Sequence, residues 1–166
     1  MKFTISATEL NAKLIALAKV MNSKVALPIY STFLLELKDG VLRITASDMD
    51  CSRCSTLPVI DMDGANGHSE SICVTASFLL DSLKNLGDQP VTFEADEENL
   101  SVVIRYNNGQ FDMVGFPAKD YVLPGTMEKN VKATIEASVL NDSIGKSLYA
   151  VGNDDLRPIF CGIYFT

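Results

Sequence analysis

The chain repeats its opening stretch near its end at a constant offset and without a gap, and this repeat limits the fold more than any other feature. In each copy a short strand leads into a helix, then into a loop with a Pro-Ile pair, then into a second strand. The matching pairs are Thr4-Ile5 with Thr134-Ile135, Ala7 with Ala137, Leu10-Asn11 with Leu140-Asn141, and Pro28-Ile29 with Pro158-Ile159. A repeat of this length is a domain and not a solenoid unit. The second copy reaches Thr166 inside its second strand, so we expect the sequence to stop within a second domain.

The composition is that of a globular protein with an acidic surface. Of the 166 residues 47% are hydrophobic, which is enough for a packed core and argues against disorder. No apolar run approaches the ~20 residues of a membrane span, and Met1 leads directly into a strand without a secretory signal. We therefore expect a soluble, cytoplasmic protein. The net charge of −7 argues against a nucleic-acid binder that is basic all over, but not against one whose lysines gather on one face.

Two helices are predicted in the first part of the chain. The first runs from residue 8 to residue 22, with Thr8 as its N-cap. Its apolar stripe comprises Leu10, Leu14, Leu17 and Met21, and its opposite face carries Ala12, Ala16 and Lys19. The second helix runs from residue 77 to Gly87. Its stripe comprises Leu79, Leu83 and Leu86, and Phe78 lies toward its polar side.

Short alternating segments predict the strands around these helices. They cover residues 3–6, 33–37, 41–46, 51–60, 71–74, 91–95, 100–106 and 111–116, with tight turns at Asp39-Gly40 and Asn107-Asn108-Gly109. The order β-α-β-β-β-β-α-β-β-β indicates an α+β domain with a largely antiparallel sheet. We expect this first domain over residues 1–117 and an incomplete second domain over 131–166. Residues 118–130 are predicted as a linker, because prolines and a glycine interrupt any periodicity there.

Cys51 and Cys54 have the spacing of a thiol redox motif or of half a zinc site. No second pair follows, and His68 is the only histidine, so a four-ligand zinc site lacks its usual residues. The flanking residues predict a strand, in which residues three apart point to opposite faces, whereas a redox pair normally opens a helix. We expect reduced, metal-free cysteines on a strand. A thiol oxidoreductase built on this pair remains an alternative.

The sequence contains no arrangement typical of a catalyst. It has no glycine-rich phosphate loop, no His-Glu metal motif and no nucleophilic serine elbow. Acidic residues cluster at Asp48-Met49-Asp50, Asp61-Met62-Asp63 and Asp96-Glu97-Glu98, each at a turn or a strand end where charge is ordinarily solvated. We expect a protein that is not an enzyme and uses neither a cofactor nor a metal.

Several motifs, all in the same order along the chain, resemble those of the bacterial DNA polymerase III β subunit family, the replicative sliding clamps. They are Met1-Lys2-Phe3-Thr4-Ile5, Leu27-Pro28-Ile29, residues 42–50, Val74-Thr75-Ala76, Asp120-Tyr121, Leu123-Pro124 and residues 156–163. Chains of this family have three such domains, and two chains close head to tail into a ring around duplex DNA. The resemblance implies a DNA clamp fold with antiparallel sheets outside and the two helices on the inner face.

The resemblance also implies functional residues. Lysines that lie off the apolar stripes would contact DNA phosphates through water and would not read the bases. These lysines are Lys13, Lys19, Lys24, Lys84 and Lys146. Ser77 stands where some members have a basic residue, and Asn153-Asp154-Asp155 is less favourable to phosphate than the family's polar loop. The subunit interface would comprise Phe78, Gln110, Phe111 and Met113. Arg157 would border the groove that binds short peptides of polymerase and clamp-loader subunits.

We therefore expect the N-terminal portion of a processivity factor in DNA replication, which encircles duplex DNA without sequence specificity and tethers DNA polymerase III. Catalysis would belong to the polymerase, and the full-length protein would be a ring-shaped homodimer. The five lysines would share one concave side, and the isolated chain would be a monomer that binds DNA poorly. A protein-interaction module of the same fold without a DNA role is the other alternative, and salt-dependent DNA binding separates the two.

Overall fold

The computed structural model describes residues 1–21, 27–63, 69–125, 133–154 and 156–166. The chain divides into two compact units, Met1–Gly125 and Thr126–Thr166. Within the described residues, no helix has both the length and the apolar character needed to cross a membrane.

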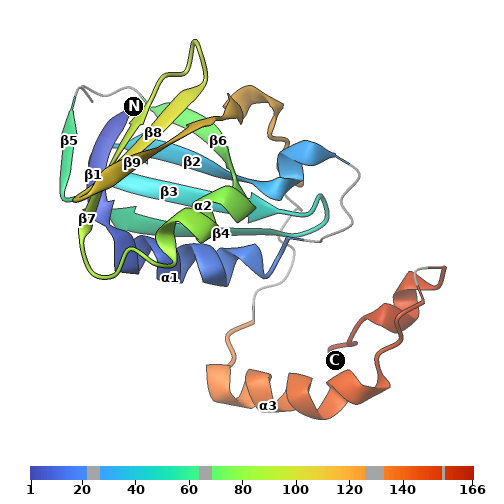
Figure 1. The fold of residues 1–166 in the computed structure, drawn as a ribbon. Coiled ribbons are helices and arrows are strands. Elements are labelled where there is room, and N and C mark those ends of the chain that lie inside the picture. Colours follow the sequence, from blue (N-terminus) through green and yellow to red (C-terminus); the bar gives the residue numbers. More distant parts are fainter. Residues whose placement is uncertain (22–26, 64–68, 126–132, 155) are drawn as a thin grey trace. The chain divides into compact units, whose positions relative to one another are not determined.

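The described strands of the first unit form two antiparallel sheets (Figure 1). The first sheet has the order β5-β1-β7-β8-β9, and the second has the order β10-β6-β2-β3-β4. Their bounds are β1 (Lys2–Ser6), β2 (Thr32–Lys38), β3 (Val41–Ser47), β4 (Ser52–Pro58), β5 (Asp61–Asp63), β6 (Glu70–Thr75), β7 (Pro90–Ala95), β8 (Ser101–Tyr106), β9 (Gly109–Val114) and β10 (Phe116–Pro117). All of these pairings are antiparallel, which confirms the predicted α+β class.

The first unit consists of two similar halves that exchange their opening strands. β1 runs directly into α1 (Ala7–Ala18), β6 runs directly into α2 (Ala76–Leu83), and three longer strands follow each helix. β1 pairs with β7 of the second half, whereas β6 pairs with β2 of the first half. The corresponding helix residues are buried: Ala7 with Ala76, Leu10 with Leu79, and Leu14 with Leu83. This exchange joins both halves in one core.

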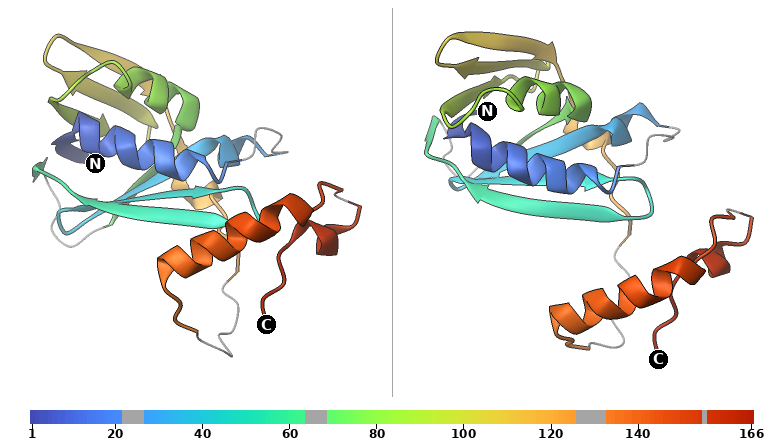
Figure 2. Two further views of the ribbon diagram at one scale, coloured as in Figure 1. Left: turned by 90° about the horizontal axis from the view of Figure 1, so that it is seen from below. Right: turned by 60° about the horizontal axis from the view of Figure 1, so that its bottom comes forward.

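α1 and α2 lie side by side on one side of the two sheets (Figure 2). Their apolar stripes and the inward residues of both sheets enclose one main core, which includes Phe3, Phe33 and Phe93. Phe3 and Phe93 stack with ring centroids 5.0 Å apart. The expected placement of both helices on the same face is therefore confirmed, and it leaves their polar sides together on one surface.

The first helix begins and ends slightly earlier than predicted. Ser6 caps α1 instead of Thr8, because the Ser6 Oγ accepts a hydrogen bond from the Glu9 N–H at 3.3 Å. α1 ends at Ala18 and not at residue 22. The N–H groups of Val20 and Met21 donate to the carbonyl oxygens three residues back, those of Leu17 and Ala18, and these bonds tighten the turn.

One predicted strand is shortened and another is divided where the chain passes from one sheet to the other. The predicted strand 51–60 ends at Pro58, and β5 follows in the other sheet, at residues for which no strand was predicted. The predicted strand 111–116 is divided into β9 and β10 by Gly115. A Cβ atom on Gly115 would lie 2.8 Å from the carbonyl oxygen of Cys73, so the close approach of two main chains requires glycine here.

The first unit also includes residues 118–125, which the sequence predicts as the start of a linker. A 3₁₀ helix (Ala118–Asp120) leads to Tyr121, which is buried. The rings of Tyr121 and Tyr30 meet edge-on with centroids 5.6 Å apart. The Tyr30 hydroxyl also donates a hydrogen bond to the carbonyl oxygen of Val122, the residue after Tyr121, at 2.9 Å. With Leu34 and Cys73 these tyrosines form a second small core, which ties the segment to the second sheet.

The second unit contains the helix and the turn that the repeat predicts. α3 (Ala137–Ser147) begins at the residue that the repeat matches with Ala7, where α1 begins. The 3₁₀ helix Pro158–Cys161 likewise occupies the place in the second copy that the 3₁₀ helix Pro28–Ser31 has in the first, and a further 3₁₀ helix (Leu148–Ala150) follows α3. The two copies therefore share local structure as well as sequence.

The strands predicted for the second copy do not form. Residues 133–136 and 163–166 belong to no strand among the described residues. In the first unit the corresponding β1 is held between β5 and β7, and a strand without such neighbours has no partner for its main-chain groups. On α3, Leu140 and Ile144 are half-buried, and Leu148 directly after the helix is exposed, since no sheet covers them within the described part of this unit.

Candidate functional site

The polar sides of the two packed helices form the first candidate surface. We define the helix layer as α1, α2 and their C-cap residues Lys19 and Lys84. Its exposed charged side chains are three lysines and two carboxylates: Lys13, Lys19, Lys84, Glu9 and Asp81. The layer is thus slightly basic on a chain whose net charge is −7.

The three lysines of the helix layer differ in whether their ammonium groups are already paired with a carboxylate. The Lys84 ammonium lies 2.7 Å from the Asp81 carboxylate, in a pair that is exposed on both sides. Lys13 and Lys19 make no ion pair or side-chain hydrogen bond with any other described residue. An exposed pair such as that of Lys84 contributes only ~0–1 kcal/mol, but it must open before the lysine can meet another anion. Lys13 and Lys19 are therefore the more available cations.

Arg53 adds a fourth cation that the sequence did not predict. Its Nη1 donates a hydrogen bond to the carbonyl oxygen of Ala16, in the last turn of α1, at 2.9 Å. Arg53 lies on β4 four residues before Leu57, which is buried, and the period of two along a strand places both on the helix side of the sheet. The spacing of four residues between Arg53 and Leu57 could have predicted from the sequence that Arg53 lies on the helix side of the sheet.

The two cysteines beside Arg53 are free and exposed. Cys54 lies on β4, but Cys51 precedes that strand, so the prediction that both lie on a strand is wrong for Cys51. The Asp48 carboxylate accepts hydrogen bonds from the N–H groups of Asp50 and Cys51 at 3.3 and 2.8 Å and holds a turn there. In the described part of the chain, no group of three or more His, Cys, Asp and Glu side chains could hold a metal ion.

Cys73 is the buried cysteine of the second small core. Burial raises the pKa of its thiol to about 12, and a hydrogen bond with the Thr32 side chain opposes this only in part. Burial likewise raises the pKa of Tyr121 to about 12. Both groups are neutral near pH 7 and serve packing.

The edge strand of the first sheet is the second candidate surface. Within the described sheet β9 pairs only with β8, so its other side is open to a further strand. Phe111 and Met113 point toward the main core and are half-buried. Gln110, Asp112 and Val114 point the other way and are exposed, and the Gln110 amide donates to the Asp112 carboxylate at 3.0 Å.

An aromatic cluster links this edge to the helix layer. Phe78 on α2 is 36% exposed and meets the ring of Phe111 edge-on, with centroids 6.5 Å apart. Tyr106 stacks on the ring of Phe111 at 4.9 Å. The structure thus brings together Phe78 and Phe111, two of the predicted interface residues, and leaves Phe78, Phe111 and Met113 all incompletely buried.

The remaining predicted residues lie elsewhere. Lys24 and Asp155 fall outside the described residues. Lys146 is exposed in the last turn of α3, in the second unit. Arg157, also in the second unit, is exposed, and its Nε lies 4.0 Å from the Asp154 carboxylate.

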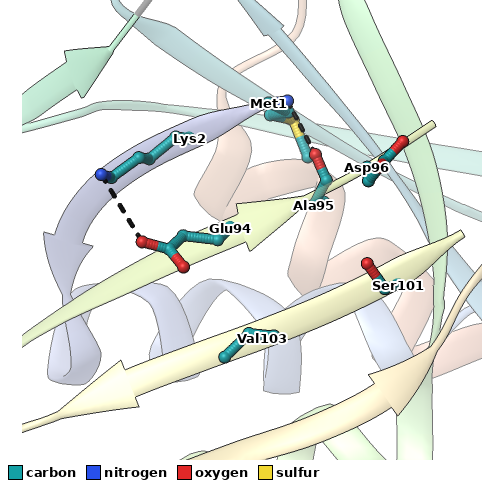
Figure 3. A pocket seen from close by; sticks show the side chains of 7 residues that line it. All are labelled: Met1, Lys2, Glu94, Ala95, Asp96, Ser101 and Val103. Carbon is teal, nitrogen blue, oxygen red and sulfur yellow. Dashed lines mark hydrogen bonds and ion pairs between the residues drawn. The ribbon is translucent and has the colours of Figure 1, made fainter. Parts of the chain in front are cut away.

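A cavity of about 510 Å³ lies on the first sheet and includes none of these residues (Figure 3). Its charged groups are already engaged. The Met1 ammonium donates to the Ala95 carbonyl oxygen at 2.7 Å, and the Lys2 ammonium lies 3.5 Å from the Glu94 carboxylate. The cavity therefore offers a small ligand little unpaired charge.

Known proteins are similar to this chain in sequence and in fold. The beta sliding clamp of Bacillus subtilis (strain 168) is 27% identical over 166 residues, which cover 98% of this chain and 44% of that protein. A DNA polymerase sliding clamp from Pseudomonas aeruginosa aligns with a TM-score of 0.85 and 23% identity, over 96% of this chain and 42% of that one. The Helicobacter pylori beta clamp bound to a DNA ligase peptide aligns with a TM-score of 0.81 and 23% identity, over 93% of this chain and 41% of that one.

The chain thus spans less than half the length of these proteins. The two TM-scores show that these structures have the same fold as this chain over the aligned residues. The family model of the DNA polymerase III beta subunit, N-terminal domain, matches residues 1–124, and the chain therefore belongs to this family.

Proposed function

We propose that this chain is the N-terminal portion of a sliding clamp, a ring that encircles duplex DNA and tethers DNA polymerase III during processive synthesis. The family match over residues 1–124 carries this proposal, together with a helix layer that is basic on an otherwise acidic chain. The protein itself is not an enzyme and needs no cofactor. It promotes synthesis by encircling the DNA and holding the polymerase on it, and the polymerase catalyses the reaction.

The helix layer meets the DNA backbone. Lys13 and Lys19 are exposed and free of carboxylate partners among the described residues, so they contact phosphates, directly or through water. Ala12, next to Lys13 in the sequence, is exposed, and its side chain is too short to enter a groove. Such contacts carry no base information and are weakened by salt, which suits a protein that must slide. Lys24, Lys84 and Lys146 complete the proposed set of contacts.

The β9 edge closes the ring. An open strand edge beside half-buried apolar side chains is a surface that recruits another chain. We assign Phe78, Gln110, Phe111 and Met113 to the contact between this domain and the third domain of a second subunit. The complete protein is then a head-to-tail homodimer, whereas the present chain by itself is a monomer.

Partner proteins bind the ring through short peptides. The Helicobacter pylori relative was solved with a DNA ligase peptide, and we propose that DNA polymerase III and clamp-loader subunits bind here in a similar way. Arg157 borders the proposed peptide groove. Because the ring acts on chromosomal DNA during replication, we place it in the cytoplasm.

Retention on DNA of different topology tests the proposal. A chain with the full length of the relatives and this segment at its N-terminus is loaded onto a nicked circular plasmid by its clamp loader. We expect the protein to stay on the circle during gel filtration and to leave after a restriction enzyme linearises the plasmid. Equal retention on circular and linear DNA would contradict encirclement. Absence of any DNA association would favour a protein-interaction module of the same fold.

A further inference from the structure

We propose that Arg53 forms a phosphate contact at the C-terminal end of α1 and that the helix itself positions its guanidinium. The inference rests on the proposed function and names a residue for the DNA-facing surface. It begins from one contact, the hydrogen bond of 2.9 Å from Arg53 Nη1 to the carbonyl oxygen of Ala16. A guanidinium has five N–H donors in a planar fork, so this bond leaves donors for an external anion.

The end of a helix at which Arg53 lies is normally unfavourable for phosphate. The last carbonyl groups of a helix have no partner within it and carry a partial negative charge. α1 has no basic residue in its last turn, and the nearest cation of its own sequence is Lys19 at the C-cap. Arg53 adds direct compensation from β4, since it binds one of these carbonyl oxygens and places a full positive charge beside it. The end of α1 thereby becomes compatible with a phosphate.

A second cation lies on the same side of α1. Lys19, the C-cap residue, follows Ala16 by three positions, and residues three apart are neighbours on a helix surface. Lys19 is exposed and has no partner among the described residues. Arg53 and Lys19 therefore flank the same turn, one from the strand and one from the helix. Two cations there can share one phosphate or contact two neighbouring ones.

The other arginines of the first unit have a different environment. Arg43 Nε lies 3.6 Å from the Glu36 carboxylate, and Arg105 Nε donates to the Glu94 carboxylate at 3.2 Å. Within the described part of this unit, Arg53 is the arginine without a carboxylate partner. The nearby Asp48 carboxylate instead accepts main-chain N–H groups of its own turn. Arg53 thus keeps its charge available.

A titration with DNA tests this inference. The ¹⁵N-labelled chain is titrated with a short DNA duplex at low salt, and amide and arginine Nε–Hε shifts are followed by NMR. We expect Arg53 and the last turn of α1 to shift. We expect Arg53→Gln to weaken binding about two- to fivefold, as for the loss of one exposed ion pair, and to reduce the salt slope by about one. Arg105→Gln is the matched control and should leave both quantities unchanged.

The possible outcomes separate this inference from the proposed function. If residues around Lys13 and Lys19 shift but Arg53 does not, and Arg53→Gln binds like the unchanged chain, the Arg53 contact is refuted and the DNA-facing layer stands. If no helix-layer residue shifts at low salt, the Arg53 contact and the DNA-facing layer are both refuted, whereas encirclement by the full-length ring is decided by its retention on circular and linear DNA. A structural role for Arg53 is recognised from thermal unfolding, because Arg53→Gln would then lower the melting temperature without changing the salt slope. That result would also overturn the inference.

Discussion

The ring of Phe78 meets the ring of Phe111 edge-on, with centroids 6.5 Å apart and planes inclined by 89°. This contact joins α2, in the helix layer, to β9, the edge strand of the first sheet. Edge-on packing is a favoured arrangement of aromatic rings and contributes ~0.5–1.5 kcal/mol beyond the burial of area. The surface proposed for DNA and the surface proposed for the second subunit are thus held together by one aromatic cluster.

Phe111→Ala should destabilise the isolated chain and also weaken the subunit contact. Phe111 packs on the main core but is only half-buried, so we expect a loss of about 2 kcal/mol, roughly half of the ~3–5 kcal/mol typical of a fully buried phenylalanine. Urea unfolding of the chain measures this loss. In a full-length ring, analytical ultracentrifugation should find a weaker dimer.

Val114→Ala is the control for this prediction. Val114 lies on the same strand but is 70% exposed, so its removal should change the unfolding free energy by less than about 0.5 kcal/mol. If Phe111→Ala proves as neutral as Val114→Ala, the cluster does not hold the β9 edge.

Gly115→Ala should be strongly destabilising. An added Cβ would lie 2.8 Å from the carbonyl oxygen of Cys73, and a main-chain atom cannot move aside as a flexible side chain can. We expect a cost of about 1–3 kcal/mol, in the range of overpacked cores. Thermal or urea unfolding tests this expectation. Gly125→Ala is the control, because nothing lies within 4 Å of the Cβ built there, and a similar cost for both variants would rule out the steric explanation.

The stability of the protein should fall in alkaline solution because of Cys73. Burial raises the pKa of this thiol from 9.0 to about 12, so between these two values the folded state binds more protons than the unfolded state. Stability is therefore unaffected below pH 9 and decreases as the pH rises above it. For Cys73 alone the loss between pH 8 and pH 10 should be about 1 kcal/mol, measured by urea unfolding at several pH values. Cys73→Ala should remove this part of the pH dependence, and an unchanged slope would assign it to other groups.

Charge removal in the helix layer should weaken DNA binding, whereas removal on the opposite face should not. Lys19→Gln is expected to reduce affinity for duplex DNA about two- to fivefold at low salt, since an exposed ion pair contributes ~0.5–1 kcal/mol. Lys38→Gln is the control, because Lys38 is exposed on β2 at a position that alternates with the buried Leu37. Fluorescence anisotropy with labelled duplex measures both. Equal losses in the two variants would indicate a response to net charge and not to a defined face.

The sequence by itself determined the features that depend on local pattern. The helix stripe of Leu10, Leu14 and Leu17 is buried as predicted, because a period of 3.6 residues places these side chains on one side of any helix. Asp39 and Gly40 form the predicted turn with φ of 49° and 77°, the left-handed values that a two-residue hairpin of this type needs. The internal repeat likewise predicted the position of α3 from that of α1.

Only the tertiary structure decided the features that depend on contacts between distant residues. The exchange of β1 and β6, the hydrogen bond from Arg53 to Ala16 and the packing of Phe78 on Phe111 join segments that no local pattern relates. The predicted strand at residues 134–135 fails for the same reason, since a strand is stabilised by its neighbours and not by its own sequence. The surface proposed for DNA could thus be outlined from lysines on helices, but Arg53 joins it only because β4 packs beneath α1.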